Sequence, residues 1–326
     1  MSVANPALPG IAAIEPPSPA PSGLSVPRPS KVWMGRLVAI LTGGSAFLTI
    51  AALLWILGTI ALGGAGHVTW AFLTQAPSEG MTGGGIFPAI VGTFFLVILM
   101  SIAGVPIGTI TAIYLTEYVG QRHPIGRTIR FAVNTLSGIP SIVFGLFGLG
   151  FFIQFLGGGM DKVMNHGELY WGQPSILWAS LTMAFLTLPV MIVSVEEALR
   201  NVPRELREAS LALGATKLET IRKVVLPQSA SGILTGGILA VSRGAGEVAP
   251  ILFTGAAYFL PHLPTSLNNQ FMHLGYHIYI MSTQSPDVDA TRPIQFATTL
   301  VLLALTFSLN FIAIFLRWHM RRKAIR

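Results

Sequence analysis

The sequence contains no cysteine, and Asp, Glu, Lys and Arg together make up only 10% of its 326 residues. The first absence excludes disulfide bonds, a thiolate nucleophile and any metal site ligated by cysteine. The second excludes an ordinary soluble domain, in which roughly 25% of the residues are charged. Hydrophobic residues reach 52%, and the mean hydropathy is +0.66. We therefore predict an integral membrane protein.

Several long stretches carry no charged residue, and most of them exceed the roughly 20 residues that cross a bilayer as a helix. They are apolar at consecutive positions, which excludes the alternating strands of a β-barrel. The stretch 248–286 is interpreted as a helix end followed by a loop that Pro261 and Pro264 break. We predict an all-α integral membrane protein with six transmembrane helices, near residues 37–62, 86–116, 131–156, 173–195, 229–258 and 293–316.

The N-terminal segment has a different composition, with eight prolines in residues 1–30 among Ala, Ser and Gly. Such a segment favours extended, solvated backbone, so we expect a disordered tail over 1–30 and a six-helix domain over 31–326. The tail lacks a basic start followed by an apolar stretch and a cleavage site, and it is therefore not interpreted as a signal peptide.

The basic residues divide unequally between the two sides of the expected membrane. Seventeen of the 20 lie in the terminal tails and in the loops 117–130 and 197–228, whereas Lys162 and Arg292 lie on the other side. By the positive-inside rule, both termini are expected in the cytoplasm. The net charge of +7 does not indicate nucleic acid, because these residues flank apolar spans rather than covering one face of a soluble fold. Membrane lipid is the expected surrounding.

The loop 197–228 is expected to contain two short helices that meet at Gly214. Residues 202–214 begin with a proline in the first turn and end at this glycine, which is suited to a left-handed helix end. Thr216 and Glu219 have the spacing of a capping box, which predicts the start of a second helix, and Pro227 marks the entry into the fifth span.

An apolar stripe runs along the first of these helices, because Leu206, Ala209 and Leu213 lie at positions i, i+3 and i+7 among charged neighbours. A stripe of this kind needs a partner. It fits a helix lying on anionic lipid, and it equally fits a helix docked into the groove of another protein. The pattern leaves both interpretations open.

The stretch Glu208-Ala-Ser-Leu-Ala-Leu-Gly214, followed by Val224-Val-Leu226-Pro227, resembles the EAA signature of ABC importer permeases. It departs from that signature at Ser210, where Ala is usual, and at Val224, where Ile is usual. The resemblance implies the type I ABC importer permease fold (MetI-like), in which this loop is a coupling helix seated in a cleft of a cytoplasmic ATPase dimer. The residues expected in that contact are Leu206, Glu208, Ala209, Gly214, Leu226 and Pro227.

The sequence has no Gly-x-x-x-x-Gly-Lys-Ser/Thr phosphate loop with which to bind ATP. The resemblance therefore implies a non-catalytic membrane subunit without a cofactor, with ATP bound and hydrolysed in the partner chain. A membrane hydrolase is not indicated, because neither His-Glu-x-x-His nor Gly-x-Ser-x-Gly occurs.

Three further stretches, 105–118, 136–147 and 242–254, together resemble the A-type permease of the phosphate-specific importer. This resemblance implies a multi-pass protein of the bacterial cytoplasmic membrane. Its implied partners are a homologous C-type permease, the ATPase dimer, an external phosphate-binding protein and inorganic phosphate. A permease for sulfate or molybdate is the first alternative. A self-powered secondary transporter is the second, although such proteins carry intramembrane ionisable groups in several helices.

Arg243 and Glu247 are the only charged residues inside a predicted span, at the i, i+4 spacing that lets them pair. A guanidinium suits an oxyanion, so we expect a phosphate contact, while a purely structural ion pair stays an alternative. Ser137, Ser141 and Gly145 recur every fourth position in the third predicted span. They indicate either a close helix contact or a polar lining of the substrate pathway.

The pair His273-x-x-x-His277 has the spacing of two metal ligands on a helix. The surrounding loop offers no third ligand in register, so no metal site is expected there. We expect these histidines at the surface or with satisfied hydrogen bonds.

Overall fold

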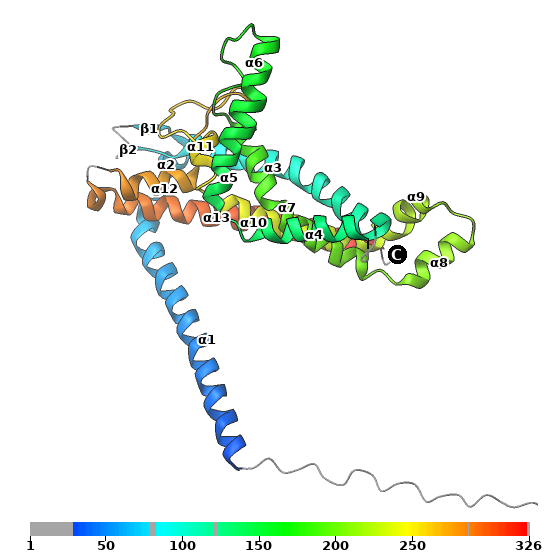
Figure 1. Ribbon diagram of the computed structural model, residues 1–326. Coiled ribbons are helices and arrows are strands. Elements are labelled where there is room, and N and C mark those ends of the chain that lie inside the picture. Colours follow the sequence, from blue (N-terminus) through cyan, green and yellow to red (C-terminus); the bar gives the residue numbers. More distant parts are fainter. Residues whose placement is uncertain (1–28, 79–82, 120–122, 286, 325–326) are drawn as a thin grey trace, which may run out of the picture. The chain divides into compact units, whose positions relative to one another are not determined.

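The computed structural model describes residues 29–78, 83–119, 123–285 and 287–324 (Figure 1). Within these residues six helices are long and apolar enough to cross a membrane, as the sequence predicts. They cover Trp33–His67, Phe87–Val119, Ser141–Met164, Ile176–Arg200, Lys217–Gly246 and Val288–His319. The chain divides into two units between Ile56 and Leu57, and each is considered by itself.

Helix α1, Pro29–Gly64, makes up the described part of the first unit and continues into the second. Pro29 suits its first position, where a missing N–H breaks no helical hydrogen bond. Apolar side chains project on all sides, and Trp55 is 76% exposed within the chain. The Thr42 hydroxyl donates to the Val38 carbonyl at 2.8 Å, so its polar group is satisfied inside the helix. The predicted tail over 1–30 lies outside the described residues, apart from Pro29 and Ser30.

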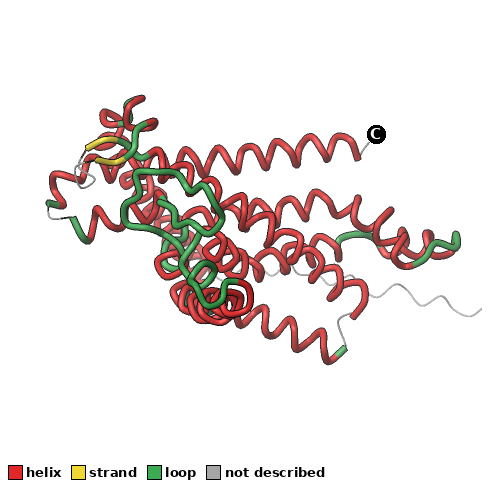
Figure 2. Tube along the Cα trace, turned by 90° about the horizontal axis from the view of Figure 1, so that it is seen from above, coloured by secondary structure: helices red, strands yellow, loops and turns green. Residues whose placement is uncertain are grey.

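The second unit is built around α7, Ile176–Arg200, which packs against α3, Phe87–Ile113, and against α10, Leu226–Gly246. Helix α13, Val288–Ala324, packs against α10. Figure 2 shows these long helices running side by side. Small residues allow α3 and α7 to approach closely. At Gly104, for example, a larger side chain would meet Ala184 of α7. The largest group of buried apolar residues includes Leu96, Met100, Ala179, Met183 and Ala245.

The third span differs from the prediction of one helix over 131–156. Helix α4, Pro124–Ser137, is separate and packs against α7, and the chain turns at residues 138–140. The span then consists of α5, Ser141–Phe147, a π-helical segment η4, Gly148–Gly157, and α6, Gly158–Met164. Pro140 explains the break, because a proline disfavours helical backbone at the residue before it.

This break also corrects the proposed stripe of small residues. Ser137 ends α4 and Ser141 begins α5, so the two do not share one helix. Gly145 does make the expected close contact: a side chain there would meet the backbone of Pro250 and the ring of Phe253.

The fifth span begins earlier and ends earlier than the predicted 229–258. Helix α9, Lys217–Thr220, the π-helical turn η5, Ile221–Val225, and α10 follow one another without interruption. The helix ends at Gly246, since Glu247 has extended backbone with φ −80° and ψ 134°. A separate short helix, α11, covers Ile251–Thr254. Gly244 and Gly246, which disfavour helical backbone, and Pro250, which follows shortly after, account for the early end of α10.

Several short elements lie at the end of the bundle where α3 begins. They are the 3₁₀ turn η1, Ala65–His67, the helix α2, Trp70–Thr74, and an antiparallel pair of strands, β1, Pro77–Ser78, and β2, Gly83–Gly84. Helix α12, Leu274–Thr283, lies in the predicted loop and packs against α13. A second group of buried residues, including Phe72, Ile86, Met272 and Leu274, holds this end together.

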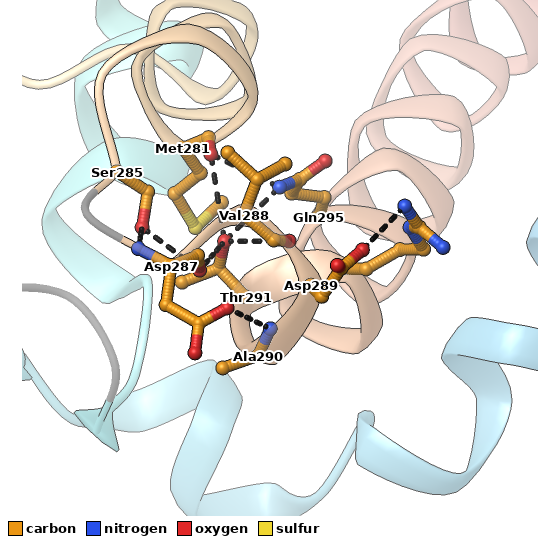
Figure 3. Close-up of polar contacts among 9 residues, drawn as sticks. Met281, Ser285, Asp287, Val288, Asp289, Ala290, Thr291 and Gln295 are labelled. Atoms are coloured by element: carbon orange, nitrogen blue, oxygen red, sulfur yellow. Dashed lines mark hydrogen bonds and ion pairs between the residues drawn. The ribbon is translucent and has the colours of Figure 1, made fainter.

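Helix α13 starts five residues before the predicted 293, and Figure 3 shows the polar contacts at its start. Asp287 Oδ1 accepts a hydrogen bond from the Ala290 backbone N–H at 2.9 Å, which is an N-cap contact. Gln295 Nε2 donates to the Met281 carbonyl at 3.0 Å and thereby ties the end of α12 to α13. An aspartate N-cap is a local signal for this earlier start.

Candidate functional site

The loop between the fourth and fifth spans has the two-helix form that its sequence predicts. Helix α8 covers Arg204–Ala212, and Gly214 has φ +85°, the left-handed conformation expected of it. At the start of α9, Thr216 Oγ1 accepts from the Glu219 N–H at 3.3 Å, and Glu219 Oε2 accepts from the Thr216 N–H at 3.0 Å. The predicted capping box is therefore present.

The apolar stripe of α8 has no cover within the described chain. No residue of α8 is buried, and Leu213, which follows it, is 89% exposed. Leu206, Glu208, Ala209 and Gly214 are likewise exposed. Leu226 and Pro227 lie in the first turn of α10, directly after the π-helical turn η5.

Arg207 attaches α8 to the helical bundle. Its Nη2 lies 2.9 Å from Glu117 Oε1, in the π-helical turn η3, Tyr114–Val119, at the end of the second span. The guanidinium also donates to the carbonyls of Val202 at 2.6 Å and Leu199 at 2.7 Å. The side chains of Arg207 and Glu117 are only 18% and 10% exposed. The sequence gives no signal for this contact, because 90 residues separate the partners.

A second ion pair lies at the same end of the bundle. Arg130 of α4 donates through Nε to Glu196 Oε1 at 3.0 Å, and through Nη2 to the Leu115 carbonyl at 2.7 Å. The other oxygen of Glu196 lies 3.4 Å from Arg200 Nη2. These contacts join α4, the second span and α7, so the base from which α8 projects is cross-linked by partly buried charges.

Arg243 and Glu247 form an ion pair, with Arg243 Nε 3.8 Å from Glu247 Oε1. Arg243 lies in the last turn of α10, whereas Glu247 lies just beyond the helix, so the two do not share a helix face as predicted. Their side chains are 36% and 24% exposed. In the described chain Arg243 has no other ion pair, and most of its donors are available to a ligand. The neighbouring Ser242 donates to Asn310 of α13 at 2.7 Å and fixes the helix.

The two serines proposed for the pathway lie on either side of the turn between α4 and α5. The Ser137 hydroxyl donates to the Val133 carbonyl at 3.2 Å, within α4. Ser137 is exposed and Ser141 is half-buried. Among the described residues, no hydrogen bond joins either serine to Arg243 or Glu247, so the structure does not bring these four residues together.

The two histidines contradict the expectation of a surface position or satisfied hydrogen bonds, since His273 and His277 are both buried. His273 Nδ1 accepts from the Gly275 N–H at 3.1 Å, but Nε2 of His273 and both ring nitrogens of His277 lack partners in the described chain. Burial lowers the pKa of each histidine to about 4, so both are neutral at physiological pH. His277 lines a cavity of about 270 Å³ together with His67.

Comparison with known proteins identifies the class of this chain. Residues 104–324, more than half of the chain, match the family "binding-protein-dependent transport system inner membrane component". A probable ABC transporter permease of Bacillus subtilis, YqgI, is 31% identical over 84% of this chain and 92% of that protein. The phosphate transport system permease protein PstA of Yersinia pestis is 34% identical over 75% of each chain.

Solved structures support the same fold. A bacterial alginate ABC transporter, crystallised with an alginate-bound periplasmic protein, contains a chain with a TM-score of 0.60 and 14% identity, covering 90% of this chain and 96% of that one. At this identity the likeness concerns the fold alone. With its six apolar helices and its similarity to PstA permeases, this chain belongs to the family of binding-protein-dependent transport system inner membrane components, the multi-pass permease subunits of ABC importers.

Proposed function

We propose that this permease subunit forms part of the phosphate pathway of an ATP-driven phosphate importer. The observation that carries the substrate assignment is Arg243, a cation in the last turn of a membrane-spanning helix, held by one carboxylate at 3.8 Å and still 36% exposed. An intramembrane charge is costly to retain, and a guanidinium offers several donors to an oxyanion. The similarity to the PstA phosphate permease of Yersinia pestis supports phosphate over other anions.

The pathway residues have different roles in transport. Arg243 contacts phosphate as it crosses the membrane, and Glu247 compensates the arginine when no anion is present. The exposed Ser137 and half-buried Ser141 supply hydroxyl groups along the pathway. A homologous C-type permease contributes the opposite wall, and an external phosphate-binding protein delivers the anion. The periplasmic protein in the alginate transporter complex supports a delivery partner of this type.

Coupling to ATP is proposed to run through α8. Its uncovered apolar stripe and the exposed Glu208, Ala209 and Gly214 fit a cleft in a cytoplasmic ATPase dimer, which binds and hydrolyses ATP. Leu226 and Pro227 connect this contact to the fifth span. The proposal places α8, both termini and the segment 1–30 in the cytoplasm of a bacterial cell, in accord with the distribution of Lys and Arg.

The substrate assignment is tested by reconstituting the complete complex in vesicles and measuring ATP hydrolysis. External binding protein is added after loading with phosphate, sulfate or molybdate. We expect stimulation by the phosphate-loaded protein alone. Equal or greater stimulation with sulfate or molybdate would overturn the assignment.

The role of the ion pair is tested by four variants, Arg243→Gln, Arg243→Lys, Glu247→Gln and the neutral double variant. If Arg243 contacts phosphate, Arg243→Gln abolishes phosphate uptake while the complex still assembles. Arg243→Lys retains little uptake, because lysine lacks the planar guanidinium group. If the pair is only structural, both single neutral variants lower the yield of complex, and the double variant restores yield and transport together. Restored transport in the double variant would therefore contradict the phosphate contact.

A further inference from the structure

An apolar groove of about 440 Å³ lies between the end of the second span and the start of the fifth. One wall comes from the last turn of α3 and from η3, and the other from α9, η5 and the first turn of α10. Both walls therefore include π-helical turns, which are rare and occur frequently at functional sites. The groove belongs neither to the Arg243 pair nor to the exposed stripe of α8.

The chemistry of the lining changes from one end of the groove to the other. Ile110, Ile113 and Leu226 lie in the charge-free stretches of their two spans. Toward the loop, Tyr114 and Tyr118 stack with ring centroids 6.4 Å apart. Tyrosines of this kind concentrate where a membrane meets water. The apolar end therefore lies at the level of lipid chains, and the aromatic end at the level of headgroups.

Two cations lie at the aromatic end. Lys217 Nζ lies 4.8 Å from the centre of the Tyr118 ring, and Arg222 is an exposed residue of the groove lining. The charge-free stretch of one span ends at Glu117, which pairs with Arg207, and that of the other begins after Lys223. Both helices thus leave the apolar layer at the same level, with positive charge beside the opening of the groove.

We propose that this groove binds an acidic phospholipid from the membrane leaflet on the side of α8. An acyl chain lies against Ile110 and Ile113, and the phosphate group lies near Lys217 and Arg222. A protein that stays outside the membrane, such as an ATPase, cannot reach Ile110 and Ile113, which lie inside the charge-free stretch of the second span. The lipid would also touch η3, the turn whose Glu117 holds Arg207, so it would stabilise the base of α8. This inference does not depend on which anion the importer carries.

The first test measures lipid affinity. The full-length chain in detergent micelles is titrated with phosphatidylglycerol or phosphatidylcholine and followed by native mass spectrometry. We expect tighter binding of phosphatidylglycerol, weakened about five-fold for each cation removed in Lys217→Gln and Arg222→Gln. Lys223→Gln is the matched control: this exposed lysine pairs with Glu219 at 3.5 Å, and it neither lines the groove, as Arg222 does, nor lies over a lining ring among the described residues, as Lys217 does. Equal affinity for the two lipids, or an unchanged affinity in both variants, would overturn the proposal.

The second test identifies the occupant in the assembled transporter. A photo-crosslinking benzophenone amino acid replaces Ile113, and the complete complex is irradiated in vesicles that contain phosphatidylglycerol. A phospholipid adduct at residue 113 supports the proposal. A crosslink to a helix of another membrane subunit would show that protein fills the groove, and would overturn it.

Discussion

Replacing Arg207 by glutamine should release α8 from the bundle without unfolding the spans. The change removes the ion pair to Glu117 and two hydrogen bonds to backbone carbonyls. It leaves a carboxylate that is only 10% exposed without a cation. Removing one partner of a buried pair costs about 3–5 kcal/mol, and the remaining solvent access of this pair favours the lower limit. We therefore expect the docking of α8 to weaken by about 3 kcal/mol, or about 100-fold.

Hydrogen exchange of the α8 backbone amides measures this docking directly in the purified full complex. Arg207→Gln should raise the exchange rate in α8 about 100-fold. Glu117→Gln leaves both carbonyl contacts of Arg207 in place, so it should weaken the docking of α8 by only about 1 kcal/mol. The double variant should cost less than the sum of the single changes, because it leaves no unpaired carboxylate. Lys223→Gln, whose pair with Glu219 is 72% and 47% exposed, should leave the exchange of α8 unchanged, because exposed ion pairs contribute little to stability. Unchanged protection of α8 in Arg207→Gln would refute the reasoning.

Three further predictions concern other parts of the chain. Gly214→Val should uncouple ATP hydrolysis from transport, because a β-branched residue is strained at φ +85°; wild-type uptake would contradict this. His273 and His277 have folded pKa values of about 4, against an unfolded value near 6.5. The protein should therefore lose stability as the pH falls from about 6.5 to about 4, by at most about 3 kcal/mol per histidine. The melting temperature of His277→Phe should depend less on pH than that of the wild type, and an identical dependence would refute this prediction. Gly92→Ala should destabilise the fold by about 1–3 kcal/mol, since its new methyl group would overlap the Met272 carbonyl oxygen; an unchanged melting temperature would exclude that contact.

Local rules predicted much of the fold correctly. Charge-free stretches gave the six spans, since charged residues are expensive inside a bilayer and rarely occur there. The left-handed Gly214 and the capping box at Thr216 also followed from short patterns, because both are set by backbone geometry within one or two turns. These features depend on neighbours along the chain and not on tertiary contacts.

Other features could not be predicted because distant parts of the chain decide them. The helix predicted over 131–156 is divided in the structure, because a separate amphipathic helix, α4, ends at Ser137 and packs on α7, a contact that residues 131–156 alone do not reveal. The contact of Arg207 with Glu117 joins segments 90 residues apart. Of the candidate pathway residues, Arg243 and Glu247 were paired correctly by spacing, although their helix ends between them.

The uninterrupted course of α9, η5 and α10 has a mechanical consequence. Arg243 is 26 residues after Lys217 on one continuous helical stretch, which corresponds to a distance of about 39 Å at 1.5 Å per residue. Such a rod acts as a lever with the loop at Gly214 at one end and the charged pair near the other. A tilt of about 5° around the loop end displaces the Arg243 end of the rod by about 3 Å. Because Glu247 directly follows α10, the ion pair moves with the rod as a unit. A small rotation imposed at the loop therefore moves both charges by about 3 Å relative to any helix that does not tilt.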